Sequence, residues 1–149
     1  MPFRLTKTFA VDATFETMVP LAELENHRKL LQRSGVYVIH EKAIEPQEFT
    51  PYSSNVLYIG KAIGETIYSR CRKHRQAIAE HGLGKDEAKM RPGKRFQEYR
   101  ARASGEPGVL LISAAFLAKD QPHLISCAEE YLIHAYEQQH GHKPRANTK

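Results

Sequence analysis

Two β-rich runs near the middle of the chain restrict its fold most strongly. Residues 35–40 read GVYVIH and residues 55–60 read NVLYIG, and both runs are rich in the β-branched and aromatic residues that favour strands. The stretch between them, residues 41–54, contains two prolines and two serines, which are typical of a loop. The two runs therefore predict two neighbouring strands joined by a long exposed loop.

The rest of the chain predicts one more strand and several helices. Three segments are expected to be helices. Residues 21–33 carry leucines near helical spacing, and residues 67–78 repeat apolar positions at helical spacing after Thr66. Residues 122–140 begin with Pro122 and are followed by Gly141. Thr66 and Pro122 favour helix starts, and Gly141 favours a helix end. Residues 109–117 (VLLISAAFL) form the most apolar run and predict a central buried strand. Residues 8–11 are a candidate for a further short strand.

The order of these elements predicts an α+β fold. We expect a small, mostly antiparallel three-stranded sheet flanked by helices. A chain of 149 residues is long enough for one domain with a single core. Residues 1–34 are expected to form an N-terminal extension with one helix packed on that core, and residues 35–149 the main domain.

Positive charge is concentrated in one part of the chain. The formal net charge is +5, and residues 61–102 hold 12 Lys and Arg against 5 Asp and Glu, whereas the remainder holds 10 against 12. Such a basic stretch attracts polyanions by direct attraction and by counterion release. It indicates a nucleic-acid partner, although a solvated basic surface without a partner is the alternative.

Composition argues against membrane, secreted and zinc-binding proteins. No apolar run approaches the roughly 20 residues of a membrane span, and the N-terminus lacks the apolar core of a signal peptide. The two cysteines, Cys71 and Cys127, are too few for a disulfide framework or a four-cysteine zinc site. We therefore expect a cytoplasmic protein with no membrane partner.

An ordered set of short motifs resembles the GIY-YIG nuclease superfamily. Each residue of the set is ordinary by itself, and the prediction depends on all of them occurring in order. The resemblance extends from about Gly35 to Asn147, roughly three quarters of the chain. The set consists of Gly35-Val36-Tyr37, Tyr58-Ile59-Gly60-Lys61, Arg70, His74, Glu129 and Asn147.

This resemblance implies a GIY-YIG-like fold and a metal-dependent endonuclease that hydrolyses the phosphodiester bonds of DNA. Glu129 would hold one Mg²⁺ or Mn²⁺ ion, since Mg²⁺ prefers carboxylate oxygens and retains several waters. Arg70 would bind phosphate oxygens through its forked guanidinium. Arg72 is the alternative for this role, but the spacing of Ile67, Arg70 and His74 favours Arg70.

The tyrosines would prepare the attacking water. An ordinary tyrosine has a pKa near ~10 and is a poor base, but a nearby cation such as Lys61, Arg70 or the metal favours the phenolate. We expect Tyr37 to be the base and Tyr58 to position water or phosphate, with the reverse assignment open. His74 would assist proton transfer or bind phosphate, and Asn147 would organise the site. The residues expected to contact nucleic acid are Gly60, Lys61, Arg72, Lys73, Arg75, Lys94 and Arg95.

Two other classes of function compete with the nuclease. One is a nucleic-acid-binding module that keeps the fold but cuts nothing, and the other is a protein-interaction domain with an acidic partner. Neither needs the full motif set. The expected substrate is double-stranded or branched DNA. A homo-oligomer would suit a double-strand cut, but the sequence identifies no interface.

Overall fold

The computed structural model describes residues 2–4, 10–15, 17–41, 50–81 and 110–147. Its centre is an antiparallel sheet of four strands in the order β1-β4-β2-β3. The α+β class expected from the sequence is confirmed, and the sheet has four strands where three were expected. The strands are β1 (Thr17–Pro20), β2 (Gly35–Glu41), β3 (Val56–Ala62) and β4 (Leu110–Phe116).

The strand that the sequence did not predict is β1, which pairs with β4 from Thr17↔Ala114 to Pro20↔Leu111. Its four residues are too few to show a period, and one of them, Met18, is 54% exposed. Pro20 lacks an N–H donor and is tolerated because β1 is an edge strand. The sequence also suggested a short strand at residues 8–11. Residues 10 and 11 have no regular structure, and residues 8 and 9 lie outside the described residues.

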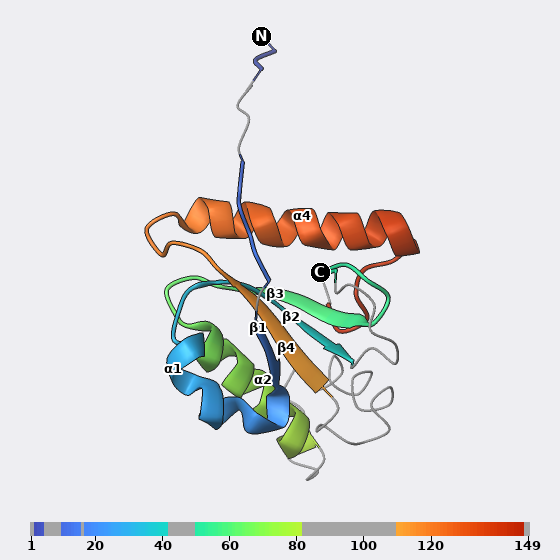
Figure 1. The fold of residues 1–149 in the computed structure, drawn as a ribbon. Helices are drawn as coiled ribbons and strands as arrows, with labels where there is room; N and C mark the ends of the chain where they lie inside the picture. Colours follow the sequence, from blue (N-terminus) through green and yellow to red (C-terminus); the bar gives the residue numbers. More distant parts are fainter. Residues whose placement is uncertain (1, 5–9, 16, 42–49, 82–109, 148–149) are drawn as a thin grey trace.

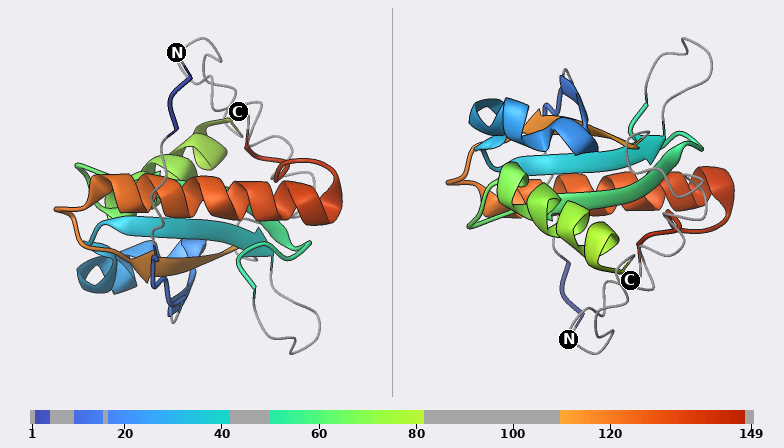
Figure 2. Two further views of the ribbon diagram at one scale, coloured as in Figure 1. Left: turned by 90° about the horizontal axis from the view of Figure 1, so that it is seen from above. Right: turned by 90° about the horizontal axis from the view of Figure 1, so that it is seen from below.

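Helices cover both faces of the sheet (Figure 1). One face carries α4 (Pro122–His140), and the other carries α2 (Ile67–His81), the 3-10 helix η1 (Leu21–His27) and α1 (Arg28–Leu31). Figure 2 shows α4 over the sheet from above and α2 over it from below. Two apolar clusters, one on each side, result from the alternation of side chains along β2: Val36 and Val38 face α4, while Tyr37 and Ile39 face α2.

The helix ends follow the residues that predicted them. The Thr66 hydroxyl accepts a hydrogen bond from the N–H of Ser69 at 3.1 Å, as an N-cap does. Gly141 ends α4 in the left-handed conformation, with φ of 76°, and its N–H donates to the carbonyl of Glu137. The helix expected at residues 21–33 is instead η1 followed by α1; Glu23 inside η1 and His27 before α1 both depart from helical backbone angles.

Gly35 fixes how closely two strands approach. A Cβ at this position would lie 2.1 Å from the carbonyl oxygen of Ala115 in β4, so only glycine lets β2 begin here. Lys94 and Arg95, two of the residues expected to contact nucleic acid, lie outside the described residues. In the part of the chain that the structure describes, no helix has the length and apolar character needed to cross a bilayer.

Candidate active site

Two tyrosine rings pack over a glycine on the α2 face of the sheet. Tyr37 in β2 is paired with Gly60 in β3, and the rings of Tyr37 and Tyr58 have centroids 6.0 Å apart. A Cβ at Gly60 would lie 2.5 Å from Cε1 of Tyr58 and 2.7 Å from Oη of Tyr37. The absence of a side chain at Gly60 is therefore what allows the two rings to meet.

His74 joins the tyrosines from the third turn of α2. Its Nε2 lies 2.6 Å from the hydroxyl of Tyr37, and its ring centroid is 4.6 Å from that of Tyr58. Tyr37 is fully enclosed, and Tyr58 and His74 are 5% and 6% exposed. The three side chains form a buried polar cluster with a direct hydrogen bond between a phenol and an imidazole.

Arg70 lies one helical turn before His74 on the same face of α2. Its Nε is buried and has no hydrogen-bond partner, while Nη1 lies 3.5 Å from a carboxylate oxygen of Glu65 and the side chain is 34% exposed. The alternative arginine, Arg72, is exposed. Arg70 is thus the arginine that joins the tyrosine cluster to solvent.

Burial and a neighbouring cation have opposite effects on the pKa of Tyr37. Burial raises the pKa of Tyr37 well above its ordinary value, the neighbouring Tyr58 raises it further, and Arg70 lowers it by less. Desolvation disfavours the charged form and here outweighs the cation. Tyr37 is therefore a neutral phenol in the free protein.

Lys61 and Glu129 form a second group on the other face of the sheet. Lys61 follows Gly60 in β3, so its side chain points towards α4. There its Nζ lies 3.6 Å from Glu129 Oε1 and 3.2 Å from Ser126 Oγ. Burial raises the pKa of Glu129, whereas Lys61 and, more weakly, Arg70 lower it. The edge strand β3 thus separates the tyrosine cluster from the Lys61–Glu129 pair. The charge of Arg70 lowers the pKa of both Tyr37 and Glu129.

Asn147 lies along the open edge of β3. Its Oδ1 accepts the N–H of Ile59 and its Nδ2 donates to the carbonyl of Ile59, each at 2.9 Å. The N–H of Ala146 donates to the carbonyl of Leu57 at 2.9 Å. Asn147 therefore acts as a short substitute for a neighbouring strand and positions the residue between Tyr58 and Gly60.

Most of the other predicted DNA-binding residues on α2 already have acidic partners. Arg75 forms a two-point ion pair with Glu25, and Lys73 Nζ lies 3.0 Å from Glu65. Arg75 lowers the pKa of Glu25 to about 2. A DNA phosphate would therefore have to replace a carboxylate at Arg75 or Lys73.

Two residues that the sequence did not single out contact the site. Glu65 contacts both Arg70 and Lys73, and Ser126 contacts Lys61. The position of Glu65 just before the capping residue Thr66 places it one turn from Ser69, with which it forms a hydrogen bond of 3.3 Å. That spacing is the signal that could have identified Glu65. No comparable local signal identifies Ser126, because its contact depends on the packing of α4 against β3.

The donor set limits which metal the site can hold. Among the described residues there is no group of three or more His, Cys, Asp or Glu side chains suited to a metal ion. A tetrahedral zinc site with several protein ligands is not formed by them. A single half-buried carboxylate, Glu129, does fit Mg²⁺ or Mn²⁺, which takes one or two carboxylates together with waters and substrate phosphates.

No family model, curated protein or solved structure matches this chain. The resemblance to the GIY-YIG nucleases therefore rests on the motif residues alone. These residues form a buried tyrosine–histidine cluster on the α2 side of β3 and a lysine–glutamate pair on its α4 side.

Proposed function

We propose that this protein is a metal-dependent endonuclease that hydrolyses phosphodiester bonds of DNA with a GIY-YIG-type site. The observation that best supports the proposal is the gathering of Tyr37, Arg70 and Glu129 around one edge strand, although each comes from a different element. A module that only binds DNA needs basic side chains. It needs neither a buried tyrosine–histidine pair nor a half-buried carboxylate.

Arg70 is suited to bind the phosphate that is cut. Its buried Nε lacks a hydrogen-bond partner, and such a donor is costly to leave unsatisfied. The ion pair between Nη1 and Glu65 is 3.5 Å long and partly exposed, so it holds the guanidinium only weakly. A phosphate oxygen would satisfy the buried donor and replace Glu65 at the same time.

Tyr37 would act as a base through His74. A neutral phenol can take a proton from water only while it passes its own proton on, and His74 Nε2 lies 2.6 Å away. In the tautomer with hydrogen on Nδ1, Nε2 accepts that proton. The water's electron pair then forms the new P–O bond, the old P–O bond breaks, and the departing oxygen takes a proton from solvent water.

Glu129 would hold the divalent cation, with Lys61 beside it. When bound there, Mg²⁺ or Mn²⁺ supplies positive charge to the phosphate and to the departing oxygen. Lys61 contacts the Glu129 carboxylate at 3.6 Å, and it is free to turn to a phosphate oxygen once the carboxylate has another cation. Arg70 and Lys61 then meet the same phosphate from the two sides of β3.

Cleavage of plasmid DNA tests this proposal. Purified protein is incubated with supercoiled plasmid, with a branched DNA and with single-stranded DNA, in Mg²⁺ or in chelator. We expect cutting in Mg²⁺ only, loss of cutting in Arg70→Ala, and retained cutting in Arg72→Ala, which changes an exposed arginine two positions away. Intact substrate in every condition, with DNA still bound, would support the binding module instead.

A further inference from the structure

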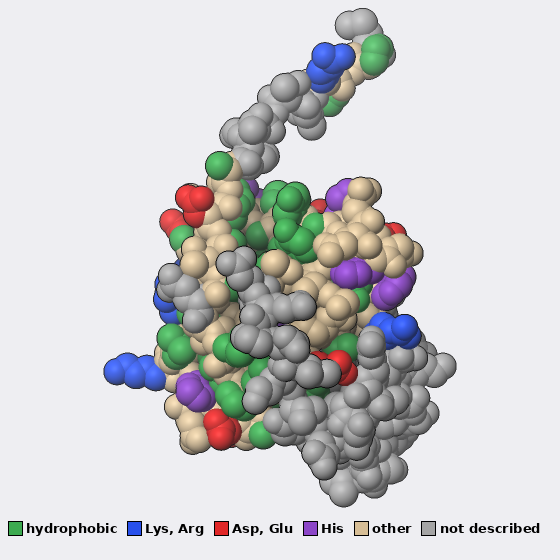
Figure 3. Space-filling model, turned by 45° about the vertical axis from the view of Figure 1, so that its right-hand side comes forward, with side chains coloured by type: hydrophobic (Ala, Val, Ile, Leu, Met, Phe, Trp, Pro, Cys, Tyr) green, Lys and Arg blue, Asp and Glu red, His purple; other side chains and the backbone are tan. Residues whose placement is uncertain are grey.

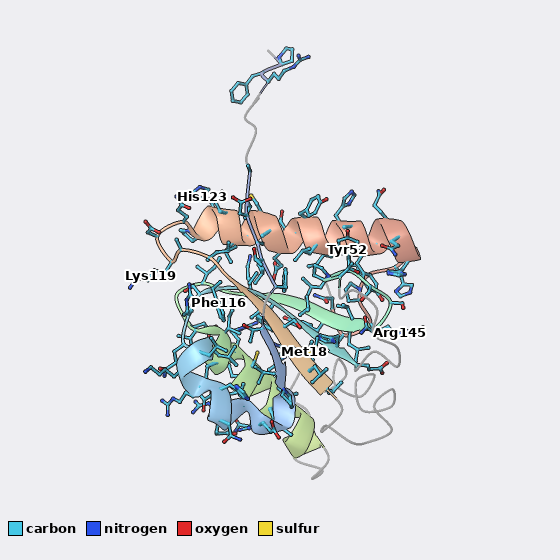
Figure 4. All side chains as sticks on the ribbon, in the orientation of Figure 1. Met18, Tyr52, Phe116, Lys119, His123 and Arg145 are labelled. Atoms are coloured by element: carbon cyan, nitrogen blue, oxygen red, sulfur yellow. The ribbon has the colours of Figure 1, made fainter. Side chains whose placement is uncertain are left out.

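A basic concavity at the C-terminal end of the protein adjoins the site described above and shares Asn147 with it. It has a volume of about 360 Å³ and is lined by His142, Lys143, Pro144, Arg145 and Asn147. None of the described residues that line it is acidic. Figure 4 shows Arg145 beyond the C-terminal end of α4 and Lys119 at the opposite end of the molecule. Figure 3 shows histidine and basic side chains side by side at this end.

The cations of this concavity differ from the paired cations around the candidate active site. Lys143 and Arg145 are exposed, and within the described residues neither forms an ion pair, whereas Lys61, Lys73 and Arg75 each contact a carboxylate. Cations without a carboxylate neighbour keep their full attraction for an anion. Lys143 and Arg145 therefore form a basic surface that no carboxylate of the described residues neutralises.

The concavity is built on a fixed backbone. Asn147 and Ala146 are hydrogen-bonded to Ile59 and Leu57 along β3, and the N–H of Asn147 donates to the carbonyl of Pro144 at 2.9 Å. Ala146 is only 1% exposed. Lys143 and Arg145 thus extend from a segment anchored to the sheet, which reduces the entropy lost on binding.

The same hydrogen bonds set the distance between the concavity and the candidate active site. From Lys61 to Leu57 the chain advances four residues along β3, or about 13 Å at ~3.3 Å per residue. This length corresponds to the axial rise of about four base pairs of DNA. One DNA segment can therefore reach both places.

We propose that Lys143 and Arg145 bind a backbone phosphate of the DNA a few nucleotides from the bond that is cut. This inference rests on the proposed function, because it takes DNA as the ligand. Contacts to phosphates position a duplex without reading its sequence. The concavity would thereby fix where along the strand the tyrosine cluster meets the phosphate.

Salt-dependent DNA binding in chelator tests this inference without cleavage. The affinity of a fluorescently labelled duplex is measured by anisotropy at several salt concentrations for the unmodified protein, for Lys143→Ala/Arg145→Ala, and for Lys119→Ala as a matched exposed control. We expect the double variant to bind more weakly and its slope of log K against log salt to become shallower by about 0.9, the change for one lost phosphate contact. Lys119→Ala should leave both unchanged.

An unchanged slope in the double variant, with an unchanged melting temperature, would overturn the inference. So would binding of poly-glutamate that depends on Lys143 and Arg145 when DNA binding does not, since the partner would then be an acidic protein. The outcome is separable from that of the nuclease proposal. A shallower slope in a protein that never cuts DNA would support phosphate binding by Lys143 and Arg145 and reject the nuclease.

Discussion

Gly60 is the residue on which the geometry of the tyrosine cluster most depends. It lies opposite Tyr37 in the sheet and beside Tyr58 in the chain, and any Cβ would overlap both rings. The rings are buried in the sheet–helix core, so neither can move away without disturbing its neighbours. The glycine of the second triad is therefore required by packing, whatever role the tyrosines have.

Gly60→Ala should destabilise the protein by about 1–3 kcal/mol, as overpacked cores do. Urea unfolding measures this change. In a Tyr58→Ala background the same substitution should cost less, because the closest overlapping atom belongs to Tyr58. Two costs that simply add in the double variant would contradict the close contact, since residues in contact are expected to couple.

Glu129 gives a pH dependence whose sign can be worked out. Its pKa in the folded protein is raised above the ordinary value of 4.5 by burial. Its contribution to stability is thus present below that ordinary value and is lost as the pH rises through the folded pKa. Cation binding needs the carboxylate, so it should weaken on acidification at a higher pH than for an ordinary glutamate.

Two neighbouring substitutions should move the pKa of Glu129 in opposite directions. Lys61→Met removes a charge that lowers it and should raise the pKa, whereas Glu130→Gln removes a charge that raises it and should lower the pKa. Carbon NMR titration of the Glu129 carboxyl measures both shifts. Shifts of the same sign would show that the Lys61–Glu129 contact does not form as described.

At the scale of elements, β3 is an edge strand whose outer side is partly covered by the C-terminal segment. The Asn147 amide uses both the N–H and the carbonyl of Ile59. Because outward-facing backbone groups recur every second residue in an antiparallel strand, Lys61 also turns its N–H and carbonyl outward. A DNA phosphate at this edge would therefore meet the side chain and the amide of Lys61 together.

Asn147→Ala should remove both hydrogen bonds to Ile59 and lower stability by about 1–3 kcal/mol. Hydrogen exchange should show faster exchange of the Ile59 amide, while Lys143→Ala, which changes an exposed side chain nearby, should leave that amide protected. Unaltered protection of Ile59 in Asn147→Ala would mean that the C-terminal segment does not hold β3.

The sequence predicted the elements that have strong local patterns and missed the one that lacks them. The runs that became β2, β3 and β4, and the capped helices α2 and α4, were all recognisable from periodicity and from end residues such as Thr66 and Gly141. Strand β1 was not, because its pairing with β4 joins residues about ninety positions apart and only Val19 of its four residues is buried.

The candidate site was predictable in its residues but not in its arrangement. Spacing on one helix face brings Arg70 and His74 to the same side, which the sequence allows one to infer. The raised pKa of Tyr37 depends on burial by several elements, which the sequence does not show, whereas the opposing effect of Arg70 was expected. Side chains alternate between the two faces along β3, and Lys61 comes directly after Gly60. Lys61 and its partner Glu129 therefore lie on the face opposite the tyrosines.

At the scale of the whole molecule, we propose that DNA approaches along the β3 edge. Both faces of the sheet are covered by helices (Figure 1). The candidate active site and the basic concavity both lie at the β3 edge of the sheet. The carboxylates that neutralise Arg75 and Lys73 lie on the α2 side. The duplex would therefore contact α4 and the C-terminal segment more than the outer surface of α2.

Single-turnover cleavage of supercoiled plasmid in Mg²⁺ by Glu129→Gln and Glu130→Gln tests the central claim most directly. The two residues are adjacent but lie about 100° apart around the helix, and Glu130 is exposed whereas Glu129 contacts Lys61. We predict that Glu129→Gln lowers the rate by about 10²-fold or more and that Glu130→Gln stays within about twofold of the unmodified protein. Equal rates in the two variants would contradict the assignment of Glu129 and the active site built around it.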